Sequence, residues 1–335
     1  MSEHELRDAI IRHSLQLQRL SAGEAAKAEG ILRELERELR MLMASQNLSA
    51  ATKAELAALI RDAEKAIAPA YAKLADTVDT HALAIIVAEK TAEVLEDAFP
   101  AGILRPTPER LASLTRDVLI EGSPLSEWWG AQRESLKRNF AAQVRQGIIA
   151  GETNERIVRR IAGGRTEPGL MPIARRHART LVHSSVMSAA NEARLATFRK
   201  NGRFIAGVRW LATLDSIACL RCAALDGKTW DLEGRPINGT DISFVTPTLH
   251  PNCRCALSAV VKGFEDSRDG TRASSEGPIA ATTSFNDFLK RQSPAFIERT
   301  LGKKRAEMFR AGKITLRDLI SGTGRELTLD ELAGI

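Results

Sequence analysis

Cys219-Leu-Arg-Cys222 and His250-Pro-Asn-Cys253-Arg-Cys255 are the two segments that decide how this chain is organised. All four cysteines of the 335-residue sequence lie within them. Two short knuckles of soft ligands, joined by a loop without helical periodicity, form the pattern of a closed tetrahedral zinc site. The sequence therefore predicts a structural zinc clip, with five candidate ligands for four positions: Cys219, Cys222, His250, Cys253 and Cys255. One of the last three is then expected to lie beside the metal rather than on it.

Other states of the cysteines stay open. Two disulfides are disfavoured because Cys253 and Cys255 are one residue apart, and because the polar start of the chain has no apolar segment typical of a secretory signal. Free buried thiols, or a site that has lost its metal, are further alternatives. A catalytic zinc ion would need an open coordination position and a nearby carboxylate as general base, and no H-E-x-x-H or H-x-E motif accompanies the cysteines.

The segments on either side of the cysteines predict a small β unit attached to a long helix. A helix is expected from Pro172 to about Arg199. After Gly202, apolar residues alternate from Phe204 to Trp210, which indicates a half-buried strand, and the run 256–261 is its expected partner. Asp226-Gly227, directly after the first knuckle, indicates a turn.

One stretch of the sequence runs from Trp210-Leu-Ala-Thr-Leu-Asp215 through Cys219-x-x-Cys222 to Leu225-Asp226-Gly227 and ends with His250-Pro-x-Cys253-Arg-Cys255. This stretch resembles the phage Mu F-like minor head (head morphogenesis) protein family. The match extends upstream through Ala178-Arg179-Thr180 to Asn191-Glu-Ala-Arg194 and covers roughly residues 140–262. One departure is Ile217-Ala218, where such proteins more often have a polar pair.

This resemblance implies a minor head component that associates with the portal vertex and the interior of the procapsid. Such a protein assists head assembly and is expected to have a part in DNA packaging or ejection. Its implied partners are the portal protein and, beyond it, the major capsid or scaffolding protein. Its implied location is the virion, inside the capsid near the portal vertex, after assembly in the host cytoplasm.

An enzyme is the alternative, because Mu F-like domains also occur fused to effector domains: a zinc-dependent nuclease or a toxin-type effector. No G-x-x-x-x-G-K-[ST], G-x-S-x-G or strand-linked G-x-G-x-x-G motif is present. The flanking regions instead contain helical and capped segments, so we expect an assembly protein without enzymatic activity. A zinc-ribbon DNA binder would concentrate basic and aromatic residues on the knuckles, where only Arg221 and Arg254 lie.

Composition predicts a mainly α protein with a small β unit, that is, an α+β fold. Together with the motifs, it predicts a helical N-terminal arm, a helical middle and a compact zinc-clipped core. Aromatic residues make up 4% of the chain and alanine is abundant. The net charge of +6 and a pI near 9.3 permit weak, non-specific contact with DNA. No apolar run is long enough to span a membrane.

Periodicity divides the chain into five expected segments. Amphipathic helices are expected from Glu24 to Ala44, from about Leu56 to Pro69, and from about Leu83 to Pro100. Pro69 is expected to end the second helix. Residues 263–283 are rich in glycine, serine and acidic residues and read as a linker without a core. The expected segments are a helical arm (1–105), a helical middle (106–165), the Mu F-like core (166–262), the linker (263–283) and a helical tail (284–335).

Two groups outside the clip are candidate contact residues. Trp128 and Trp129 are rigid aromatic side chains that could anchor a protein partner, although a pair of tryptophans is more often core. The basic face with Arg175, Arg176 and Arg179 could meet nucleic-acid phosphates, with a solvated helix face as the alternative.

Overall fold

The computed structural model describes residues 3–48, 51–99, 102–164, 168–263 and 270–333. It is mainly helical with small antiparallel sheets, which confirms the predicted mainly α fold with a small β unit. None of the described helices is long and apolar enough to cross a membrane.

The chain forms two compact units, each assembled from segments that are distant in sequence. The helical unit comprises Arg19–Asp79 and Asp117–Val186, and the sheet unit comprises Met1–Gln18, Thr80–Arg116 and Met187–Ile335. Helices α1 (Glu3–Ala44) and α7 (Leu170–Lys200) both contribute residues to both units. The compact units are not continuous in sequence, and the boundaries of the five successive segments expected from the sequence stay a prediction.

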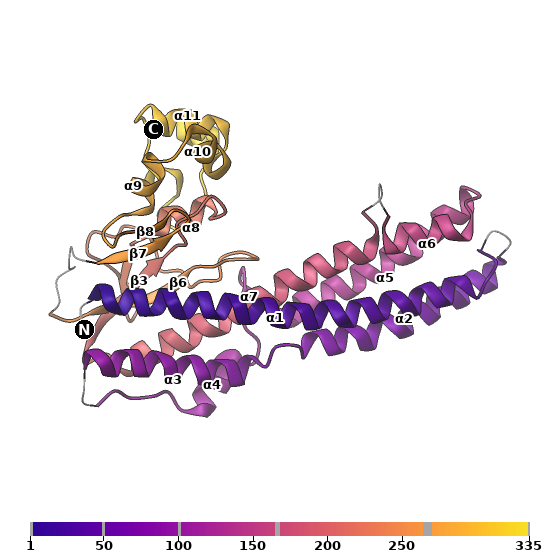
Figure 1. Cartoon of the computed structure of the whole chain (residues 1–335), viewed down its shortest axis with the longest axis horizontal. Helices are drawn as coiled ribbons and strands as arrows, with labels where there is room; N and C mark the ends of the chain where they lie inside the picture. The colour runs from indigo at the N-terminus through magenta and orange to yellow at the C-terminus, as the bar shows by residue number, and fades with distance from the viewer. Residues whose placement is uncertain (1–2, 49–50, 100–101, 165–167, 264–269, 334–335) are drawn as a thin grey trace. The chain divides into compact units, whose positions relative to one another are not determined.

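The helical unit contains the later part of α1, α2 (Lys53–Ala75), α5 (Leu125–Ile149), α6 (Asn154–Ala162) and the first part of α7. Helices α2 and α5 lie side by side (Figure 1). Their apolar stripes and that of α1 form one core, as the helical periodicity predicts. This core includes Leu35, Leu39, Ile67, Phe140 and Val144.

Pro69 does not end its helix, contrary to expectation. It lies exposed inside α2, which continues to Ala75. The next turn contains Tyr71 and Leu74, which are buried in the core of the helical unit. Burial of these side chains outweighs the hydrogen bond that a proline removes from a helix interior.

The sheet unit is built around a four-stranded sheet of order β5-β4-β3-β6. The expected strand pair is confirmed: β3 (Ile205–Leu211) pairs antiparallel with β6 (Ala256–Val261), with Trp210 opposite Leu257. On its other side β3 pairs with β4 (Thr229–Asp231), which pairs with β5 (Pro236–Ile237). The short helix α8 (Leu220–Leu225) follows β3 and begins at the first knuckle.

Other helices complete the sheet unit. They are α3 (Thr80–Ala98), α4 (Pro108–Thr115), α9 (Phe285–Lys290), α10 (Pro294–Leu301), α11 (Lys303–Arg310) and α12 (Leu329–Ala333). The C-terminal helices share one apolar core with the sheet and α8. Figure 1 shows α9 close to α8 and the hairpin. Residues 284–335 are therefore an integral part of the sheet unit.

The expected linker 263–283 needs a correction. Residues 264–269 lie outside the described part of the chain, but β7 (Thr271–Ser274) and β8 (Gly277–Ala280) form an antiparallel hairpin. Arg272 and Ala281 of this segment are buried. Its polar composition conceals this order, because the contacts that bury Arg272 come from distant parts of the sequence.

A second short antiparallel pair, β1 (Leu119–Ile120) and β2 (Ser123–Pro124), precedes α5.

Candidate metal centre

The first knuckle is shaped by the start of a helix. Cys219 is the N-cap residue of α8, and its Sγ accepts a hydrogen bond from the backbone N–H of Cys222 at 3.4 Å. This cap points the Cys219 sulfur back toward the first turn, where Cys222 also lies. A Cys-x-x-Cys pair on a helix start thereby presents both sulfurs to one point.

The second knuckle is a tight turn that leads directly into β6. The backbone N–H of Cys253 donates to the carbonyl of His250 at 3.1 Å. Asn252 occupies the left-handed region with a φ of 64°, a conformation that asparagine adopts more readily than most residues. The turn places His250 and Cys253 on the same side, and Cys255 follows immediately before the strand.

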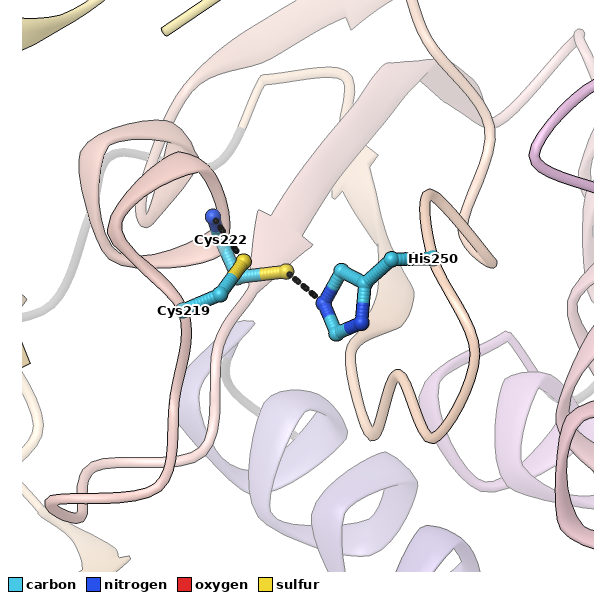
Figure 2. Close-up of side chains that lie close together, drawn as sticks. All are labelled: Cys219, Cys222 and His250. Atoms are coloured by element: carbon cyan, nitrogen blue, oxygen red, sulfur yellow. Dashed lines mark hydrogen bonds between the residues drawn. The ribbon is translucent and has the colours of Figure 1, made fainter. Parts of the chain in front are cut away.

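The structure brings all five predicted ligands together. Nε2 of His250 lies 3.3 Å from Sγ of Cys222 (Figure 2), and Sγ of Cys253 lies 3.8 Å from the same sulfur. Two overlapping groups of potential ligands result, Cys219 with Cys222 and His250, and Cys222 with Cys253 and Cys255, each with donor atoms within 4.8 Å of one another. Cys222 belongs to both groups and so occupies the centre of the cluster.

The orientation of the His250 ring is set by its own loop. Nδ1 lies 2.8 Å from the carbonyl oxygen of Pro251, to which it donates when it carries the proton. This contact leaves Nε2 directed at the Cys222 sulfur, as shown in Figure 2. A backbone carbonyl that holds the second ring nitrogen is the usual support of a metal-binding histidine.

Protonation within the metal-free cluster is strongly perturbed. Hydrogen bonds, the largest from the Cys222 thiol, lower the pKa of Cys219 to about 5. Hydrogen bonds to the sulfurs of Cys219 and Cys253 raise the pKa of His250 to about 11. The cluster thus stabilises thiolates next to an imidazolium, and a bound cation would take the place of the protons that these groups share.

The donor set fits a structural metal ion. Cys222, Cys253 and Cys255 are buried, and neither group of potential ligands among the described residues includes a carboxylate. Thiolate and imidazole are the donors that structural zinc sites use.

A charged fork joins the two knuckles independently of any metal. Arg254, between two of the cysteines, donates from Nη1 and Nη2 to the two carboxylate oxygens of Asp215 at 2.6 and 2.8 Å. Asp215 also accepts the backbone N–H groups of Ile217 and Ala218, at 2.9 and 3.0 Å, just before Cys219. This bidentate pair holds the approach to the first knuckle against the middle of the second.

Asp226 does more than the turn that the sequence indicates. Its carboxylate accepts two hydrogen bonds from the Arg272 guanidinium, at 2.9 and 3.0 Å, and one each from the backbone N–H of Ala212 and of Phe285. The Asp226 side chain is 1% exposed and that of Arg272 is 10% exposed. Asp226 therefore ties β3, the β7–β8 hairpin and α9 together. Two sequence features could have indicated this role. Asp226 closely follows the first knuckle, and Arg272 lies in the segment that was expected to be a linker.

The two tryptophans occupy different environments in the helical unit. Trp129 is 5% exposed and packs edge-on against Tyr71, with ring centroids 6.4 Å apart. It is a core residue, so the expectation that it anchors a partner needs correction: the ring is already covered by α2. Trp128 is half-buried and donates from Nε1 to the carbonyl of Ile120. Its role as a contact residue stays a prediction.

The three arginines on α7 also differ in their contacts. Arg175 pairs with Glu36, and Arg179 pairs with Glu29, both on α1 within the helical unit. Arg176 is exposed. Two of the three guanidinium groups thus serve packing between helices, and the nucleic-acid contact stays a prediction.

Comparison with known families agrees with the resemblance seen in the sequence. Residues 138–258 match the family described as phage Mu protein F like protein. This segment of the chain is similar to the phage Mu F-like family, which supports the resemblance predicted from the sequence. The match begins within α5 and ends within β6, so it includes all five candidate metal ligands. No curated protein and no solved structure matches the chain.

Proposed function

We propose that this Mu F-like protein takes part in phage head morphogenesis, and that its sulfur and imidazole cluster is a structural zinc centre. The observation that carries the proposal is the convergence of five soft donors inside the segment that matches the family. Zinc suits this set because it accepts thiolate and imidazole in a tetrahedron. When bound, zinc would cross-link the two knuckles; four of Cys219, Cys222, His250, Cys253 and Cys255 would hold it.

The zinc proposal is tested on the full chain, purified in reducing buffer without chelator. Elemental analysis is expected to find about one zinc per chain, which protects the thiols from alkylation. Removal of zinc with a chelator should expose the thiols to alkylation, and return of zinc should restore their protection. A metal-free protein whose thiols react freely before chelation would contradict the proposal.

The assembly role rests on the family and on the absence of a carboxylate from the groups of potential metal ligands among the described residues. We infer a minor head protein that binds the portal protein, with the major capsid or scaffolding protein as a further partner, and that resides in the virion interior. A part in DNA packaging or ejection would follow from that position. Contact with DNA would be weak, non-specific and strongly salt-dependent, as expected for a modest net charge of +6.

The helical unit is the proposed portal-binding part. Its helix α5 ends at Ile149, whose side chain is 85% exposed. An apolar side chain this exposed stabilises the isolated protein little, but can be buried in an interface. Ile217, which is 78% exposed in the sheet unit, offers a matched control.

The test is co-expression of the full chain with the portal protein of the same phage. Wild type and Ile217→Glu are expected to co-purify with portal, whereas Ile149→Glu should weaken recovery roughly tenfold or more, since a buried charge in an interface costs about 2 kcal/mol. Equal recovery of both variants would show that portal contacts lie elsewhere. No recovery of wild type would contradict portal binding itself.

A further inference from the structure

Helix α7 contacts the edge of the sheet next to the metal centre through one buried amide. The side chain of Asn191 donates from Nδ2 to the carbonyl of Cys255 at 3.0 Å, and its Oδ1 accepts the backbone N–H of Leu257 at 3.2 Å. It thus pairs with β6 as a neighbouring strand would, by one donor and one acceptor. The contact lies on the last of the candidate metal ligands.

All hydrogen-bonding positions of this amide are used. Nδ2 also donates to the carbonyl of Met187, at 2.9 Å, one turn earlier on α7. Oδ1 faces Nη1 of Arg194 at 3.5 Å. Both Asn191 and Arg194 are 0% exposed, so water does not compete for these groups. Two acceptors lie on one side of the amide and two donors on the other, which leaves a single orientation of the side chain.

The guanidinium of Arg194 reinforces that orientation. It is wholly buried, and its Nε and Nη2 have no hydrogen-bond partner among the described residues. A buried cation that lacks a carboxylate attracts the oxygen end of the nearest amide. The positive group therefore keeps Oδ1 toward Leu257 and the Nδ2 donor toward Cys255.

We propose that Asn191 is a positioning residue for the metal centre, which fixes the path of the chain through Cys253 and Cys255 by holding Cys255 and Leu257 from outside the knuckle. The inference rests on the proposed metal-binding function. Loss of such a support typically lowers metal affinity by about 10- to 100-fold.

Asn201, the residue that directly follows the end of α7, provides a matched control. Its amide holds Leu104 in the same manner, accepting from the N–H at 2.8 Å and donating to the carbonyl at 2.8 Å, with a further bond to Thr197. Asn201 is also 0% exposed. A change at this position removes an equivalent buried clamp that does not contact a candidate ligand.

The experiment compares full-length wild type, Asn191→Asp and Asn201→Asp loaded with Co²⁺ as a spectroscopic probe. The aspartate keeps the side-chain volume and can pair with Arg194, but it presents an oxygen instead of a donor to the Cys255 carbonyl. We expect the ligand-field bands of Asn191→Asp to shift, and its affinity for Co²⁺ in competition with a chelator to fall about 10- to 100-fold. Asn201→Asp should match wild type in both measurements, whatever its effect on stability.

Identical spectra and affinities for wild type and Asn191→Asp would overturn the inference while leaving the metal centre intact. Failure of wild type to bind Co²⁺ or Zn²⁺ would instead overturn the proposed metal function. If Asn191→Asp does not fold, the inference is tested by NMR of the wild type. Removal of zinc must then shift the Asn191 side-chain amide and Leu257 backbone amide signals more than those of Asn201 and Leu104, and equal shifts would contradict the inference.

Discussion

The two compact units of this chain are stabilised in different ways. In the helical unit, apolar stripes meet in one core, and charged pairs such as Lys65 with Asp62 lie on the solvent side. The sheet unit depends in addition on buried polar connections between distant segments: the sulfur cluster, Asp226 with Arg272, and Asn191 with β6. A buried polar group is costly when its partner is removed, whereas an exposed pair contributes little. Single substitutions should therefore damage the sheet unit far more than the helical unit.

The largest difference is expected from Cys222→Ser. This change removes the sulfur shared by both groups of candidate ligands, and would remove the proposed zinc with it. Because metal-binding energy in such sites is local folding energy, we expect a loss of about 5 kcal/mol or more in the sheet unit. Hydrogen exchange should accelerate in residues 205–262 and stay unchanged in α2 and α5. Chelated wild type should show the same pattern, and uniform acceleration across both units would refute the comparison.

Asp226→Ala should have the next largest effect. It leaves the Arg272 guanidinium buried without its carboxylate, which typically costs about 3–5 kcal/mol. Asp241→Ala is the control, since both oxygens of this carboxylate accept from Nε of Arg317 but its side chain is 58% exposed. Chemical denaturation monitored by hydrogen exchange in β3 and β7 would measure both losses. A difference of less than about 1 kcal/mol between the two variants would argue against a special role for the buried pair.

A pH effect of intermediate size is expected from His13 in the sheet unit. Burial, followed by the charges of Arg194 and Lys90, lowers the pKa of His13 to about 4, against the opposing influence of Glu93. As pH falls from about 6.5 to 4, the unfolded chain binds a proton at this histidine that the folded chain does not. Stability should therefore fall over this window, by about 1–2 kcal/mol after allowance for the solvent that reaches the ring.

The measurement is thermal unfolding of wild type and His13→Gln between pH 4 and pH 7. The variant should lose less stability than wild type over this range, because glutamine does not titrate. Identical pH profiles would show that His13 is not the group responsible.

The smallest effect is expected from Arg179→Ala in the helical unit. The Arg179 side chain is 66% exposed, and its partner Glu29, which is 13% exposed, also pairs with Arg33. Its removal should change the free energy of unfolding by less than about 1 kcal/mol. Hydrogen exchange in α1 and α7 would report it, and a loss comparable to that of Asp226→Ala would remove the proposed distinction between the two units.

Local sequence patterns were sufficient to predict several features of this protein. Alternation of apolar residues identified β3 and its partner β6, and the spacing of the cysteines and His250 brought together the five residues that cluster in the structure. The resemblance to the Mu F-like family was evident from the same residues. These features are encoded within single strands, knuckles or short motifs, where each residue fixes the position of its neighbours.

Tertiary structure decided the features that depend on a distant partner. Arg272 and Asp226 are 46 residues apart in sequence, and Asn191 and Cys255 are 64 residues apart. Composition alone therefore placed Arg272 in a linker and gave Asn191 no role. The burial of Trp129 against Tyr71 and the continuation of α2 through Pro69 have the same origin. Sequence periodicity indicates which face of an element is apolar. The residues that cover this face, or that pair with a buried charge, are determined only when separate segments pack together.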